Sequence, residues 1–345
     1  MRTSTMLAAS VACLLVSPVG ADPPPSLPVD SVLVHAIDHR EESTFEVVVG
    51  PFTLAPGQHL RLPVQLAQVP IEGWLHGFSW KITDAQGAPL PDAMLHHVNL
   101  IDPDRRDLFL PIARRVMAAG RETKAQTMPR LLGYPLHADT RFLVSTMLSN
   151  PTAREVKEGS LHVRLQYSRR GEGLIAPREI FPFYLDVVGP VGPRDFEVPP
   201  GRTVRSWEGS PAVDAVILGV GGHLHDYGVE LRLEDLTDGK VIWRAEPVTE
   251  RTTHVVSVPT SELWWQGGVR VMKDHRYRWS ATYQNPTPVA APDGGMGVVA
   301  GVVFASEAEW PPLDRKDADY VADLMGTIEA PHEQQEHHHD HATGH

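Results

Sequence analysis

Short alternating segments of β-branched and aromatic residues dominate the hydrophobic pattern of this chain. Each segment is bounded by Gly, Pro, Asn or Asp, which end strands and form turns. Clear examples are residues 44–50, 77–82, 161–167 and 213–218. The chain also carries 31 prolines and 28 glycines, and prolines spread along a chain break long helices. The pattern therefore predicts an all-β protein with minor helices.

Two segments have the residue spacing of an amphipathic helix. Residues 108–119 and 314–325 each place apolar side chains three or four positions apart. The expected apolar faces are Leu108, Ile112, Val116 and Met117 in the first segment, and Tyr320, Val321, Leu324 and Met325 in the second. We expect both helices to serve packing rather than chemistry.

A weak internal repeat divides the chain into halves. Residues 52–57 (FTLAPG) recur at 196–201 (FEVPPG), and residues 150–152 (NPT) recur at 285–287. A Thr-Asp pair followed by glycine also recurs between them. Motifs that keep their order in both halves indicate two related β domains.

The domain boundary is expected in the Pro/Gly-rich connector at 189–193. The N-terminal β-sandwich would then span 30–188 and the C-terminal one 194–310. A short helix and a tail would occupy 311–345. Two sandwiches packed side by side follow from this division.

The first 21 residues have the order of a secretory signal peptide: Arg2, an apolar run at 6–16, and small residues at 19–21. The run is shorter than the ~20 residues of a membrane span, although an uncleaved N-terminal anchor remains an alternative. No other apolar run has spanning length. We expect a secreted or periplasmic protein without a membrane span, from which cleavage removes Cys13.

Charge and cysteine content exclude several functional classes. The formal net charge is −12, whereas nucleic-acid binding needs a basic surface. Cys13 is the single cysteine of the sequence, which excludes a disulfide scaffold, a cysteine-ligated metal site and a cysteine nucleophile. The 18 histidines therefore carry the candidate chemistry.

The strongest candidate site is His223-Leu-His225, which follows the strand expected at 215–220. Residues i and i+2 of a strand share a face, so both imidazoles could bind one metal. Met296 lies in a Gly-Gly-Met-Gly loop before an apolar strand at 298–304, and its thioether favours copper, especially Cu(I). The alternatives are two surface histidines and an ordinary core methionine.

A second histidine pair, His96-His97, lies in the segment 94–100. Neighbouring strand residues point to opposite faces, so this pair can share a metal only if the strand ends, bulges or twists there. Six more histidines fall within residues 332–345. That tail has almost no apolar content and is expected to be disordered, either as a solvated tail or as a weak metal scavenger.

Taken in order, these residues resemble the copper type II, ascorbate-dependent monooxygenases, the family of peptidylglycine alpha-hydroxylating monooxygenase and dopamine beta-monooxygenase. The resemblance covers residues 52–304 and rests on the order of the motifs. A His-His pair lies in the first half. A Pro-Pro-Gly turn at 199–201, the His-x-His motif with Gly228 after it, and Met296 in a small-residue loop follow in the second.

The resemblance implies two tandem jelly-roll domains with one mononuclear copper site on each, facing one another across a water-filled cleft. His223, His225 and Met296 would hold the copper that binds dioxygen. His96 and His97 would hold the copper that stores an electron, supplied in the family by ascorbate. The implied reaction is hydroxylation of a C–H bond of a small or lipophilic substrate with O2.

Three positions depart from the family pattern. Met147 stands where the family has a third histidine, which would favour the reduced metal, and His137 on the preceding turn could substitute for it. The arginine and tyrosine with which the peptide-amidating enzyme holds its substrate's carboxylate correspond to Gly221 and Ala300. A peptide with a C-terminal glycine is therefore not the expected substrate.

Two rival functions are compatible with the same sequence. A copper-binding or copper-delivery protein without turnover would also use Met147, Met296 and a histidine-rich tail. A carbohydrate- or protein-binding sandwich without metal is allowed by the eight tryptophans. That second rival leaves the histidine pattern unexplained.

Overall fold

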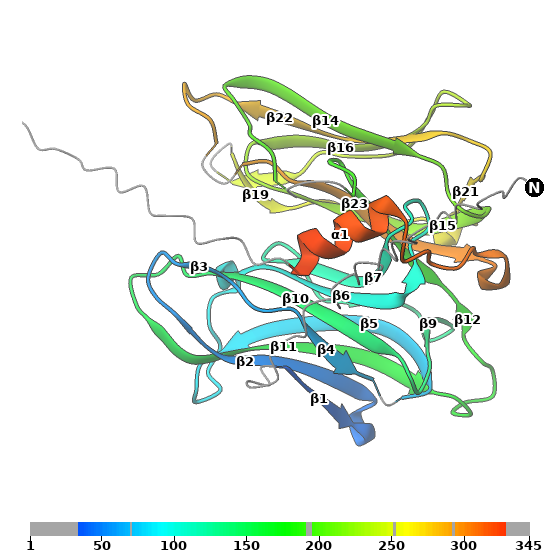
Figure 1. Cartoon of the computed structure of the whole chain (residues 1–345), viewed down its shortest axis with the longest axis horizontal. Helices are drawn as coiled ribbons and strands as arrows, with labels where there is room; N and C mark the ends of the chain where they lie inside the picture. Colours follow the sequence, from blue (N-terminus) through cyan, green and yellow to red (C-terminus); the bar gives the residue numbers. More distant parts are fainter. Residues whose placement is uncertain (1–33, 70, 191–194, 251–252, 292–293, 329–345) are drawn as a thin grey trace, which may run out of the picture. The chain divides into compact units, whose positions relative to one another are not determined.

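The segments predicted as strands are strands in the computed structural model, which describes residues 34–328 except 70, 191–194, 251–252 and 292–293. The predicted signal peptide and histidine-rich tail lie outside the described residues. Within them the fold is all-β and sandwich-like, with α1 (Ala318–Ile328) as the one α-helix (Figure 1). Short 3-10 turns add Arg40–Glu42, Asp92–Met94, Trp264–Gln266 and Glu307–Glu309.

Two sheets are built from the first half of the chain. One has the order β1-β2-β11-β5-β9-β12 with β8 beside β5, and the other has the order β3-β10-β6-β7 with β4 beside β10. Their bounds are β1 Val34–His39, β2 Thr44–Leu54, β3 His59–Arg61, β4 Gln65–Gln68, β5 Gly73–Thr83, β6 Leu95–Arg106, β7 Ala113–Gly120, β8 Gln126–Thr127, β9 Leu132–Leu136, β10 Arg141–Ser149, β11 Val156–Arg169 and β12 Arg178–Glu179.

Two further sheets and a small ribbon are built from the second half. Their orders are β13-β23-β15-β20 with β21 beside β15, β14-β22-β16-β17, and β18-β19. The bounds are β13 Phe181–Asp186, β14 Gly201–Gly209, β15 Ala215–Leu224, β16 Gly228–Asp235, β17 Lys240–Ala245, β18 Val248–Glu250, β19 His254–Ser257, β20 Ser261–Glu262, β21 Val269–Val271, β22 Tyr277–Asn285 and β23 Gly297–Ala305.

The internal repeat is visible in matching hydrogen bonds of Asn150 and Asn285. The Asn150 amide donates to the carbonyl oxygens of Leu54 (3.0 Å) and Arg154 (2.8 Å). The Asn285 amide donates to the carbonyl oxygens of Val198 (3.1 Å) and Val289 (2.8 Å). Each asparagine oxygen also accepts two bonds from the threonine two residues later. Leu54 and Val198 occupy equivalent places in the two copies of the first motif, so both halves build the same corner.

The two halves are not separate packing units. Buried apolar residues from both form one continuous core cluster, and the described residues fall in one compact unit. The expected boundary at 189–193 also differs from the sheet topology, because β13 pairs with β23. β13 therefore belongs to a second-half sheet although it precedes the Pro/Gly connector.

The predicted helix at 108–119 is wrong. Residues 113–120 form β7, which pairs with β6. The misleading positions Leu108, Ile112 and Val116 are spaced by four, a spacing that fits helical periodicity and strand alternation equally well. Long-range pairing with β6 decides between them.

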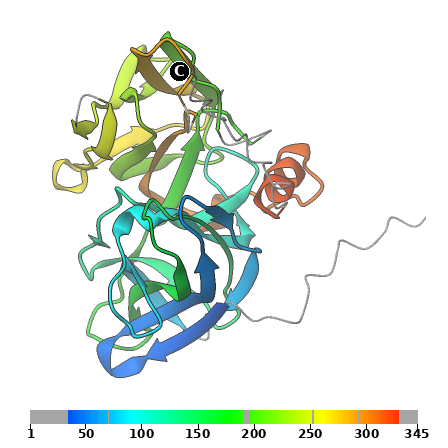
Figure 2. The same cartoon turned by 90° about the vertical axis from the view of Figure 1, so that its left-hand side faces the viewer.

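The second predicted helix is confirmed with its bounds shifted toward the C-terminus. Asp317 caps it, because its Oδ1 accepts a hydrogen bond (2.8 Å) from the Asp319 amide. Tyr320 packs in a small apolar cluster, whereas Val321 and Met325 are 44% and 42% exposed. The helix lies against first-half strands in both views (Figure 1, Figure 2). No helix among the described residues has the length and apolar character needed to cross a bilayer.

Candidate metal centre

The end of β15 and the start of β23 bring His223, His225 and Met296 together. The two strands pair antiparallel, with His223 opposite Val298 and Leu224 opposite Gly297. His225 and Met296 follow directly beyond this last pair. The ring centroids of His223 and His225 lie 5.1 Å apart, and His223 and Met296 line one cavity. The end of this strand pair therefore brings the three predicted ligands to one corner of the sheet.

Tyr283 fixes the backbone of this corner. Its hydroxyl accepts hydrogen bonds from the amides of His225 (3.2 Å) and Met296 (3.0 Å) and donates to the Met296 carbonyl oxygen. The side chain is fully buried. One hydroxyl therefore ties the His-x-His strand to the methionine loop, a link that the sequence pattern did not indicate.

His223 forms an ion pair with Glu122, which lies in the loop after β7 of the first half. The Nδ1 atom of His223 lies 2.7 Å from Oε1 of Glu122. Burial alone would raise the pKa of Glu122, but the charge and hydrogen bond of His223 outweigh it and hold the pKa at about 2. Burial lowers the pKa of His223, but Glu122 outweighs this effect and raises it above its usual value. With Nδ1 held by a carboxylate, Nε2 is the nitrogen left for a metal.

A β-bulge at the start of β6 allows His96 and His97 to act together. Met147 of β10 pairs with His97, whereas the next residue, Leu148, pairs with Leu95. His96 is therefore the extra residue of a bulge, which removes the strict alternation of faces. The ring centroids of His96 and His97 lie 5.1 Å apart. Two neighbouring histidines can share a metal where their strand bulges, and β6 bulges at this pair.

His97 has the properties of a metal ligand that is held neutral. Burial first, and then the neighbouring His96 ring, hold its pKa well below the usual value of 6.5. Its Nδ1 atom is buried and has no hydrogen-bond partner among the described residues. A neutral imidazole with a free buried nitrogen suits metal binding, because only the unprotonated nitrogen binds a metal.

The two histidine pairs meet. The ring centroids of His96 and His225 lie 5.3 Å apart, and those of His223 and His225 lie 5.1 Å apart. His59 of β3 adds a fifth ring, 6.3 Å from His96. The family resemblance implied a water-filled cleft between the two pairs, but rings at 5.3 Å leave no such cleft between His96 and His225. We call these five residues (His59, His96, His97, His223 and His225) the histidine cluster.

Of the two alternatives for the missing third histidine, Met147 is near the cluster and His137 is not. Met147 lies directly opposite His97 across the β10–β6 pairing. His137 lies in the turn that precedes β10, at the other end of the strand. Arg141 and Met147 are six positions apart along β10, which corresponds to roughly 20 Å. His59, paired across from Ser149 at the near end of β10, is the histidine that the sequence analysis missed.

The histidine rings approach as pairs rather than as a closed three-ligand set. Among the described residues, Asp235, Asp238 and His275 are the one group of three His, Cys, Asp or Glu residues with ligand atoms within 4.8 Å of one another. Within that group Asp235 pairs with His275 at 2.7 Å, and Asp238 pairs with Lys240 outside it at 2.7 Å. Each histidine pair therefore needs a further donor, such as the Met296 or Met147 thioether or a third imidazole.

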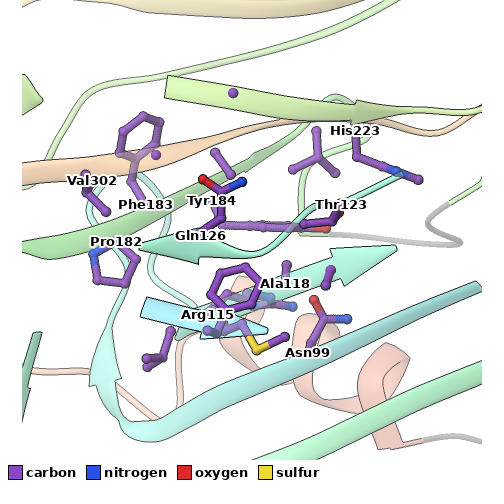
Figure 3. A pocket seen from close by; sticks show the side chains of 18 of the residues that line it. Asn99, Arg115, Ala118, Thr123, Gln126, Pro182, Phe183, Tyr184, His223 and Val302 are labelled. Atoms are coloured by element: carbon purple, nitrogen blue, oxygen red, sulfur yellow. The ribbon is translucent and has the colours of Figure 1, made fainter. Parts of the chain in front are cut away.

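A cavity of about 360 Å³ adjoins the histidine cluster, and His97, His223 and Met296 line it (Figure 3). Gly221 and Ala300, the positions of the family's carboxylate-binding residues, lie directly opposite one another on β15 and β23. Both line the same cavity. The Thr260 side chain packs over Gly221, so Gly221, Ala300 and Thr260 bound the space beside His223.

Comparisons with known proteins do not indicate a function for this chain. No protein-family model and no curated protein matches the sequence. A putative secreted protein from Eubacterium rectale is 7% identical over 72% of this chain and 68% of that chain, with a TM-score of 0.21. The structure of infectious bursal disease virus Gx strain is 10% identical over 82% of this chain and 76% of that chain, with a TM-score of 0.24. PBSX exported protein XepA is 7% identical over 83% of this chain and 100% of that chain, with a TM-score of 0.17. Likenesses this weak carry no argument about this chain.

Proposed function

We propose that this protein is a copper-dependent monooxygenase that hydroxylates a C–H bond with O2 and a one-electron reductant such as ascorbate. The observation that carries the proposal is the meeting of two histidine pairs that lie far apart in the sequence. His96 and His225 come from different halves of the chain, yet their rings lie 5.3 Å apart. Chance surface histidines have no reason to converge beside a cavity.

The donor set fits copper better than zinc, calcium or magnesium. His223 and His225 with the Met296 thioether would hold one copper, since imidazole and thioether together suit copper. His96 and His97 would hold the second, with Met147 or His59 beside them. Bound copper would supply one-electron redox chemistry and the activation of dioxygen.

The remaining roles belong to residues of the chain itself. Glu122 would orient His223 through Nδ1 and keep Nε2 directed to the metal, as carboxylates commonly do for ligating histidines. Tyr283 would hold His225 and Met296 at a fixed spacing through its three backbone hydrogen bonds. The adjoining cavity would receive the organic substrate next to the metal.

The finer fold and the location of the protein are part of the same proposal. We propose that each half is a jelly-roll sandwich, which its two predominantly antiparallel sheets and the matching corners at Asn150 and Asn285 support. The signal-peptide pattern in residues 1–21 supports a secreted or periplasmic location.

The test combines copper content with oxygen uptake. Copper-loaded protein, freed of loose metal by gel filtration, is assayed for oxygen uptake with ascorbate, and His225→Ala and His275→Ala are compared with it. His275 lies outside the histidine cluster. We expect two tightly bound coppers, with uptake that His225→Ala abolishes and His275→Ala preserves. Uptake that is unchanged in His225→Ala would contradict the proposal.

The rival copper-delivery function predicts a different result in the same assay. Copper would bind at the histidine cluster, but oxygen uptake would not exceed that of ascorbate alone. The bound copper would instead transfer to an added chelator within the time of mixing. If the protein is instead a carbohydrate- or protein-binding sandwich without metal, the wild type and His225→Ala would retain the same amount of copper.

A further inference from the structure

The cavity beside the histidine cluster has a shape set by β15 and β23. Gly219, Gly221 and His223 alternate onto one face of β15, and Val302, Ala300 and Val298 lie opposite them in that order on β23. Beyond His223, the first facing pair is therefore a glycine and an alanine. Neither of these two residues has a bulky side chain, and the small side chain of Thr260 packs over Gly221.

The far part of the cavity is apolar. Figure 3 shows His223 at one end and Pro182, Phe183 and Val302 at the other. Phe183 is 1% exposed, and further buried apolar side chains line the wall, namely Leu75, Met117 and Ile180. Removing apolar ligand surface from water against such a wall is favourable.

The ionic side chains of the wall are already paired. Arg115 donates to both carboxylate oxygens of Asp323, at 2.8 and 2.6 Å. Arg61 donates to the carbonyl oxygens of Gly326 (2.8 Å) and Thr327 (2.9 Å) at the C-terminal end of α1, where the helix dipole favours a cation.

The two carboxylates of the wall have partners as well. Glu122 is paired with His223, and Glu262 accepts a hydrogen bond from Trp265. Because burying an ion without a partner costs several kcal/mol, a charged ligand would enter this cavity at a disadvantage.

We infer that the cavity binds a neutral, largely apolar small molecule, whose polar groups meet the uncharged side chains of Asn99, Gln126 and Ser145 in its lining. The inference rests on the proposed function only in taking that molecule as the substrate. A carboxylate-bearing substrate is disfavoured by the same wall, because Gly221 and Ala300 offer it neither a cation nor a hydroxyl.

A matched pair of fluorescent probes tests the charge preference. N-phenyl-1-naphthylamine is neutral, and 8-anilino-1-naphthalenesulfonate adds one sulfonate to the same ring system. Each is titrated into metal-free full-length protein. We expect one bound N-phenyl-1-naphthylamine per chain and a Kd for the sulfonate at least ~10-fold higher. Equal or tighter binding of the sulfonate would overturn the inference.

Two substitutions locate the probe in the cavity. Ala300→Phe fills the space beside His223 and Val302→Phe fills the opposite end, whereas Ala138→Phe adds the same ring at an exposed position and is the control. Each of the first two is expected to raise the Kd of the neutral probe at least ~10-fold, with the native circular-dichroism spectrum retained. If one variant fails to fold, the other decides. Unchanged probe binding in a folded cavity variant would overturn the inference.

Failure of the cavity inference is distinguishable from failure of the proposed function. The probe titrations use metal-free protein, so they report on the cavity whether or not copper binds. Probe binding without tight copper binding would leave the ligand class standing and remove the oxygenase proposal. Tight copper binding without selective probe binding would remove the inferred ligand class and leave the oxygenase proposal standing.

Discussion

The imidazole rings of His96 and His225 lie 5.3 Å apart, nearly edge to face, although one comes from β6 of the first half and the other follows β15 of the second. The bulge at His96 and the strand end before His225 are thereby joined in one place. Metal ions held by the two pairs would be neighbours rather than occupants of distant sites. Contacts between the halves therefore belong to the chemistry of the site as well as to its stability.

The Glu122–His223 pair predicts a pH-dependent stability for the metal-free protein. The lowered pKa of Glu122 contributes stability above its unfolded pKa of 4.5, and this is lost as the pH falls toward about 2. The raised pKa of His223 contributes stability below 6.5, and this is lost as the pH rises through the folded pKa. Both contributions are therefore complete between about pH 4.5 and 6.5.

Glu122→Gln tests this window in urea unfolding at three pH values. We expect a loss of about 3 kcal/mol near pH 5.5, since the pKa shift of Glu122 from 4.5 to about 2 sets the scale. The difference from wild type should shrink near pH 2.5 and again as the pH rises through the raised pKa of His223. A difference that is constant with pH would mean that the substitution acts through packing and not through the ion pair.

Tyr283→Phe should weaken copper binding at the second-half site as well as the fold. The substitution removes the one hydroxyl that bonds the backbones of both His225 and Met296. Leaving those buried amides without a partner should cost about 1–3 kcal/mol. The copper affinity at His223 and His225 should fall with it, as measured by chelator competition.

Tyr277→Phe is the matched control for that experiment. Tyr277 is also fully buried on β22, and its hydroxyl accepts a hydrogen bond (2.8 Å) from the Met272 amide, away from the histidine cluster. We expect a similar loss of stability with unchanged copper affinity. Equal effects of the two variants on copper would remove the positioning role of Tyr283.

The first-half site should respond to Met147 and His59. Met147→His places an imidazole opposite His97 and should raise Cu(II) affinity there, because imidazole binds Cu(II) better than a thioether does. His59→Ala should lower that affinity by about 10-fold if its imidazole is a ligand. Cu(II) titration followed by electron paramagnetic resonance measures both, with Met147→Leu as the control. Unchanged spectra in both variants would leave His96 and His97 as the only protein ligands of this site.

The corners at Asn150 and Asn285 should be equally important for stability. Asn150→Ala and Asn285→Ala each remove two donated bonds to carbonyl oxygens and two accepted bonds from a threonine. We expect each to lower the free energy of unfolding by about 2–4 kcal/mol, measured by urea denaturation. An unchanged free energy of unfolding in either variant would show that the repeated motif does not contribute to stability at that corner.

Local patterns in the sequence predicted what depends on local structure. Alternation predicted the strands, and the recurring Asn-Pro-Thr motif predicted two related halves, in which Asn150 and Asn285 make matching hydrogen bonds. The glycines next to Met296 predicted a loop before an apolar strand, which β23 confirms. The helix at 314–325 was predicted within a few residues of α1 because its apolar side chains recur three or four positions apart, whereas the Asp317 cap that sets its start was not predicted.

Long-range pairing was beyond the sequence pattern. The bulge that turns His96 toward His97 depends on the register of β6 with β10, and the helix predicted at 108–119 became β7 for the same reason. Glu122 and His59 join the site through contacts with residues far away in the chain. Neither residue belongs to a local sequence motif. Predicting their place in the site would have required knowing which strands pair.

The most direct test of the central claim counts the copper held by the histidine cluster. Full-length protein and the His97→Ala/His225→Ala double variant are loaded with copper, passed through gel filtration, and analysed for copper per chain. Copper held by the C-terminal histidines is common to both proteins and cancels in the difference. We expect the wild type to retain two more copper ions per chain than the double variant. Equal copper content in the two proteins would contradict it.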